Sequence, residues 1–263
     1  MIDSFFDLPL AISGPLIVIT LCAYSVAGLF IVRRWILPRL AVKEVDGEFS
    51  GAMLQAVMVF YGLAVALMSV SVWETYGEVS KTISQEATSL ASLYRDVSSY
   101  PDPIRPHLQE DLRIYVDQVI HQAWPQQRRG EIPEGGVKLI DDFQKTLASF
   151  EPITEGQKIL HAEAMRAYNI MIQARRMRLD SVETRLPGIL WFVIVSGAFI
   201  SLCSAFFFRI QDVRLHGIQV ILLSTFIGLV IFMIFALDRP YRGDLGLSPE
   251  PYQLIYDQLM KPQ

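Results

Sequence analysis

Signals for β-strands are missing from this sequence. No run of residues alternates between apolar and polar side chains, and no Asn-Gly or Asp-Gly hairpin joins two such runs. Cysteine is scarce, and Cys22 and Cys203 both lie inside apolar runs. We expect them to act there as small, buried apolar side chains. The net charge of −4 means that basic residues are not in excess, so we expect no nucleic-acid partner. The sequence therefore predicts an all-α protein.

Motifs that carry catalytic chemistry are also missing. The sequence has no phosphate-binding glycine loop, no Gly-x-Ser-x-Gly motif and no Cys-x-x-Cys pair, and its four histidines are scattered. Neighbouring carboxylates such as Asp141 and Asp142 are more typical of a solvated helix face than of a catalytic pair. We therefore expect no enzymatic activity, no metal and no cofactor.

Long uncharged runs are the most prominent feature that is present. Four of them, 21 to 23 residues each, cover residues 12–32, 52–73, 186–208 and 217–237. About 20 apolar residues in a helix cross the hydrocarbon core of a bilayer. No Lys or Arg precedes the first run, so we expect a membrane anchor there rather than a cleaved signal peptide. These runs predict an integral membrane protein with four transmembrane helices.

The second run does not end at the membrane surface. No proline or glycine cluster follows Trp73, and apolar residues continue at helical spacing through Val79, Ile83, Leu90 and Leu93. We therefore expect one helix over residues 52–93 that leaves the membrane and joins a soluble bundle.

The rest of the segment between the second and third runs also reads as helical. Helices are expected over residues 104–124 and around 137–147, separated by a loop at 125–136. Thr154 and Gln157 form a capping box, which predicts the start of a fourth helix. The expected organisation is residues 1–73 with spans one and two, 74–185 as a helical extramembrane domain, 186–237 with spans three and four, and 238–263 as a tail that lies on the membrane or docks on the bundle.

The short connectors between spans carry positive charge. Arg33, Arg34, Arg39 and Lys43 follow the first span, and Arg209 and Arg214 lie between the last two. Short loops rich in Lys and Arg tend to stay in the cytoplasm. We therefore expect both connectors to be cytoplasmic and the long domain to be external.

Polar residues at the outer end of the second span are candidates for lining a pore. Glu74 and Glu78 lie one turn apart on one face of the helix, close to Ser71 and Thr75. A carboxylate ring at a membrane mouth, repeated by symmetry, would concentrate cations. Charges at the membrane interface with no role in conduction are the alternative.

Three further motifs are candidates for a structural or gating role. They lie near the outer part of the long helix, at the start of the third span and directly after the fourth, and their key residues are Glu86, Arg95, Asp96, Pro187, Trp191, Asp238, Arg239 and Arg242. Asp238 and Arg239 either form a stop signal at the membrane edge or lock span four to the bundle through Asp96 and Arg95.

The stretches 86–96, 186–191 and 237–243, together with the order of two spans, a long helical insert and two spans, resemble the bestrophin-like bacterial membrane family. The resemblance covers nearly the whole chain and implies kinship with bestrophins, which are pentameric anion channels. In bestrophins the long insert is cytosolic, whereas the charge rule places it outside here.

Two functions follow as expectations. The first is a homo-oligomeric ion channel whose second span lines the pore, with inorganic ions and membrane lipid as its partners. Small residues along that span, such as Gly62, Ala66 and Ser69, would let helices of several copies approach closely. The second is a non-conducting membrane sensor or scaffold whose helical domain binds a partner or a ligand.

Overall fold

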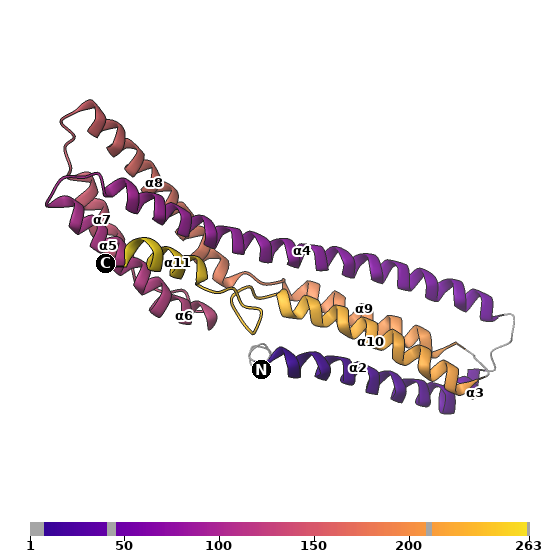
Figure 1. Ribbon diagram of the computed structural model, residues 1–263. Helices are drawn as coiled ribbons and strands as arrows, with labels where there is room; N and C mark the ends of the chain where they lie inside the picture. The colour runs from indigo at the N-terminus through magenta and orange to yellow at the C-terminus, as the bar shows by residue number, and fades with distance from the viewer. Residues whose placement is uncertain (1–7, 41–45, 209–211, 262–263) are drawn as a thin grey trace. The chain divides into compact units, whose positions relative to one another are not determined.

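The structure, a computed structural model, describes residues 8–40, 46–208 and 212–261. The described residues are almost entirely helical and contain no strand (Figure 1), which confirms the predicted all-α class. They fall into two compact units, the first formed by Met1–Thr75 with Arg185–Arg239 and the second by Tyr76–Thr184 with Pro240–Gln263. Lys43 and Arg209, two of the positive charges in the connectors, lie outside the described residues.

The first unit contains four helices long and apolar enough to cross a membrane. Its elements are α2 (Leu10–Ile31), the π-helical turn η1 (Val32–Ile36), α3 (Leu37–Leu40), the first part of α4 (Asp46–Val97), α9 (Gly188–Phe206) and α10 (Val213–Leu237). Each predicted span coincides with one of α2, α4, α9 and α10, with ends that differ by a few residues except in α4.

Close packing in this unit depends on small residues, as is usual between helices in lipid. Helices α2 and α10 pack most extensively on each other. A side chain added at Gly228 of α10 would lie 3.2 Å from the Cα of Val18 on α2. Similarly, a Cβ at Gly197 of α9 would lie 2.5 Å from the ring of Tyr61, whose hydroxyl donates to the carbonyl of Ile194. Glycine at these two positions therefore permits the approach of α2 to α10 and of α4 to α9.

The second unit is a helical bundle with its own core. Its elements are the outer part of α4, α5 (Ile104–Gln118), the π-helical turn η2 (Val119–Ala123), α6 (Trp124–Arg128), α7 (Val137–Ala148), α8 (Glu155–Asp180), the 3₁₀ turn η3 (Ser181–Glu183), α11 (Glu250–Ile255) and the π-helical turn η4 (Tyr256–Met260). The capping box predicted at Thr154 and Gln157 is present at the start of α8.

The long helix is continuous, as predicted. Helix α4 runs without a break from Asp46 to Val97. In its outer part, Val79, Ile83, Leu90 and Leu93 are at most 4% exposed, which is the apolar stripe expected from their spacing. Burying each of these side chains contributes roughly 1.5–3 kcal/mol, so the outer part of α4 is held by core packing.

One predicted loop is shorter than expected. The chain from Val119 to Arg128 stays helical through η2 and α6, so the loop begins at Arg129 and not at Pro125. Pro125 lies in the first turn of α6, where a missing N–H group costs little. Trp124 and Gln127 are buried there, so tertiary packing extends the helix past the proline.

Candidate functional site

The free face of α4 is the first part of the candidate site. In the first unit, Val65 and Val72 on one side of α4 are 6% and 4% exposed. On the opposite side Leu63, Leu67 and Val70 are 58%, 65% and 54% exposed. Only 11% of the most apolar window of this helix is buried, the smallest share among the four candidate spans. Most of α4 in this unit is therefore not covered by the rest of the chain.

The four predicted pore residues lie along this face. Ser71, Glu74 and Glu78 are exposed and Thr75 is partly exposed. At about 3.6 residues per turn, all four fall within a sector of roughly 100°, and Glu74 and Glu78 continue the row of Leu63, Leu67 and Val70. The hydroxyl of Thr75 donates to the carbonyl oxygen of Ser71 at 2.9 Å. One helix face thus changes from apolar to acidic along its length.

The second part of the candidate site is a buried ion pair inside the second unit. The carboxylate of Glu86 on α4 accepts from Nε of Arg178 at 2.6 Å and from Nη2 at 3.2 Å. The hydroxyl of Tyr115 donates to the same carboxylate at 2.8 Å. Glu86 and Arg178 are 0% and 1% exposed. The ion pair therefore links α4, α5 and α8 in the absence of solvent.

Electrostatics hold the Arg178 guanidinium in its charged form. Burial by itself lowers the pKa of Arg178, but the adjacent Glu86 carboxylate outweighs it and raises the pKa well above its ordinary value. The Arg178 guanidinium also lies 5.8 Å from the ring centre of Tyr252 on α11. The tail of the chain is therefore part of the same polar cluster.

Asp238, directly after α10, holds the start of α9 in the first unit. Its carboxylate accepts from the backbone N–H of Leu186 at 2.6 Å and from the indole N–H of Trp191 at 3.1 Å. Burial raises the pKa of Asp238, while these two bonds and nearby arginines oppose the rise. Pro187 lies at the N-cap of α9, between the two donors. Asp238 thus ties the first turn of α9 to the end of α10.

The remaining motif residues are partly buried or exposed. Arg239 is partly buried after α10, and Arg95 is exposed on α4. Asp96 is half-buried, and burial together with the nearby charge of Glu163 raises its pKa. Arg242 donates to the backbone carbonyl of Arg129 within the second unit. The proposed lock through Arg95 and Asp96 remains a prediction.

Sequence reasoning missed Arg178, and it did not link Tyr252 of the tail to the ion pair. Arg178 is buried on α8, whereas Arg175, one turn earlier, is partly exposed. An unpaired acid at Glu86, on the apolar side of α4, was the available signal, because a buried charge needs a partner. Within the residues that the structure describes, no group of three or more His, Cys, Asp or Glu side chains could hold a metal ion.

The fold and these sites define the class as an all-α membrane protein with two spans, a long helical insert and two further spans. The model of the bestrophin-like domain matches residues 19–252, and the chain belongs to this family. A crystal structure of a substituted bacterial bestrophin homologue from Klebsiella pneumoniae is similar, with a TM-score of 0.65 and 10% sequence identity over 95% of this chain and 99% of that one. At this identity the likeness concerns the fold. Comparison with curated proteins gave no match.

Proposed function

We propose that this chain is one subunit of a homo-oligomeric ion channel in which α4 lines the pore. The observation that carries the proposal is the bare face of α4, which is apolar at Leu63, Leu67 and Val70 and acidic at Glu74 and Glu78. Membership of the bestrophin-like family supports the same function.

In a symmetric assembly, the exposed face of α4 would line a central pore. Copies arranged around an axis would bring their α4 faces together, with the other faces of each α4 packed on its own α9. Rings of Leu63, Leu67 and Val70 would form an apolar constriction, which gates by excluding water. Rings of Glu74 and Glu78, one helical turn apart, would lie next to the constriction. Their charges would fall within one Debye length of each other, about 8 Å at physiological salt, and would attract cations. Lys81 opposes them, leaving one net negative charge per subunit among these three residues.

The first expected result concerns selectivity. Purified protein in a planar bilayer should conduct cations in preference to anions, and Glu74→Gln should lower that preference, on the order of tenfold, because the ring loses one charge per subunit. The measurement is the reversal potential in a salt gradient. Glu163→Gln, an exposed change on α8, is the matched control and should leave the reversal potential unchanged.

Two outcomes would contradict parts of this proposal. A reversal potential for anions that Glu74→Gln does not alter would remove the ring as a selectivity element. Absence of current from a well-folded oligomer would remove the channel and leave a non-conducting sensor or scaffold, for which the ligand groove described below is the supporting observation.

We further propose that the protein lies in the inner (plasma) membrane of a bacterium with the second unit outside. The Lys and Arg content of the two short connectors supports the orientation. The fold shared with a bacterial bestrophin homologue supports a bacterial membrane.

This orientation predicts a labelling pattern. Glu134 is exposed in the loop before α7, so Glu134→Cys should react with a membrane-impermeant thiol reagent applied to spheroplasts. The native Cys22 and Cys203 lie within spans and should give little background. Labelling of Glu134→Cys only after lysis would place the domain in the cytoplasm, the arrangement that the kinship with bestrophins implies.

A further inference from the structure

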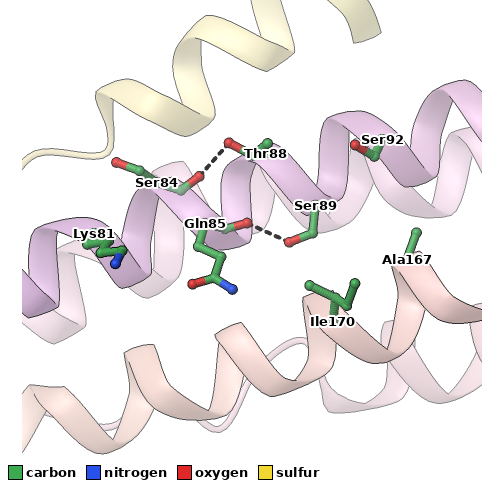
Figure 2. Close-up of a pocket in the computed structure, with 8 residues that line it drawn as sticks. All are labelled: Lys81, Ser84, Gln85, Thr88, Ser89, Ser92, Ala167 and Ile170. Carbon is green, nitrogen blue, oxygen red and sulfur yellow. Dashed lines mark hydrogen bonds between the residues drawn. The ribbon is translucent and has the colours of Figure 1, made fainter.

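A groove of about 670 Å³ lies between α4 and α8 in the second unit (Figure 2). On α4, Lys81, Gln85 and Ser89 follow one another at four-residue spacing along its wall. The amide of Gln85 extends toward α8, and Ser89 faces Ile170 across the gap. The groove is therefore polar on the α4 side and apolar on the α8 side.

The hydroxyl groups of the groove present acceptors. Ser84 donates its hydrogen to the carbonyl of Ser80 at 3.1 Å, and Thr88 donates to that of Ser84 at 2.8 Å. Ser89 donates to the carbonyl of Gln85 at 2.5 Å. A hydroxyl has one hydrogen and two lone pairs, so each of these oxygens keeps lone pairs that can accept, and that of Ser89 lies on the side of α4 that faces α8. They suit a ligand that brings donors, such as an ammonium group.

Lys81 places a positive charge at one end of the row that it forms with Gln85 and Ser89. Lys81 is exposed and is the one charged residue among those that line the groove. None of the described ion pairs involves Lys81. Its ammonium therefore suits a carboxylate, through a charge-assisted hydrogen bond.

The apolar wall of the groove, on α8, indicates that the ligand carries an aliphatic group. Ile170, which is 41% exposed, and Ala167 both point from α8 toward α4. A residue of this size left open to solvent next to polar groups would gain by contact with an aliphatic group.

We propose that this groove binds a small zwitterion with an aliphatic side chain, namely an α-amino acid. Its carboxylate pairs with Lys81, its ammonium donates to the Gln85 side-chain oxygen and to hydroxyl oxygens, and its side chain packs on Ile170. Residues one helical turn apart lie about 5–6 Å from each other. Adjacent carboxylate and ammonium groups can therefore reach Lys81 and Gln85 at the same time.

The test compares three probes of nearly equal shape on the full-length protein in detergent. Leucine carries all three groups, 4-methylpentanoate lacks the ammonium and 3-methylbutylamine lacks the carboxylate. Saturation-transfer NMR and calorimetry should show leucine binding about tenfold or more tightly than either truncated probe, because each loses one charge-assisted contact. Equal binding of the three probes, or no binding of millimolar leucine to well-folded protein, would overturn the proposal.

Variants then assign the groups. Lys81→Met should weaken leucine binding about tenfold and should not weaken the binding of 3-methylbutylamine, which lacks the carboxylate. Lys138→Met, an exposed lysine on α7, is the matched control and should bind leucine as the wild type does. Leucine affinity that survives Lys81→Met would locate the bound leucine elsewhere and reject this groove.

Discussion

Glu86→Gln is expected to destabilise the second unit by about 3–5 kcal/mol. The substitution keeps the shape of the side chain but leaves the Arg178 guanidinium charged, buried and without its carboxylate. Tyr115 also loses a charged acceptor for its hydroxyl. Hydrogen exchange measured by mass spectrometry on peptides from residues 76–184 should show faster exchange throughout this core.

A double-substitution cycle separates the ion pair from the packing. Replacing both partners, with Glu86→Leu and Arg178→Met in one chain, removes both buried charges and should recover most of the lost stability. Asp102→Asn, which breaks the exposed pair with Arg105, should cost less than about 1 kcal/mol. If Glu86→Gln is no worse than Asp102→Asn, the buried pair does not stabilise the domain.

Tyr252→Ala is expected to cost about 3–5 kcal/mol, although Tyr252 lies only eleven positions before the last residue. Tyr252 is 0% exposed and packs in the core of the second unit, with its ring centre 5.8 Å from that of Trp124. Removing a large buried ring leaves a cavity that the surrounding helices fill only in part. The same hydrogen-exchange measurement should show loss of protection in α5 and α6 as well as in the tail.

Leu254→Ala provides the control on the same helix. Leu254 is 54% exposed, so its truncation should change stability by less than about 0.5 kcal/mol. Loss of protection confined to residues 240–261 in Tyr252→Ala would mean that the tail is an appendage and not part of the core.

The helices were largely predictable because hydrophobic periodicity and length are local properties of the sequence. The four spans, the continuation of α4 beyond Trp73 and the capping box at Thr154 all depend on residues a few positions apart. The loop assigned at Pro125 was wrong at its start because burial of Trp124 and Gln127 overrides the local proline signal.

The contacts of the site were not predictable to the same degree. Glu86 stood out in a motif, but Arg178, 92 positions away, is brought to it only when α4 and α8 pack together. Likewise, Asp238 was singled out at a membrane edge, whereas its two donors lie 52 and 47 positions earlier. Side-chain partners at such separations follow from the packing of helices, which no local pattern encodes.

The sequence by itself determined that this is an all-α membrane protein with four spans and a long helical insert, because bilayer thickness and helix geometry translate directly into run lengths and periods. Only the tertiary structure decided which arginine partners Glu86, that the tail docks through Tyr252, and that hydroxyl groups, Lys81 and Ile170 line one groove. The physical reason is that a helix has several faces of similar polarity, and the face that meets a neighbour is chosen by packing against the whole bundle.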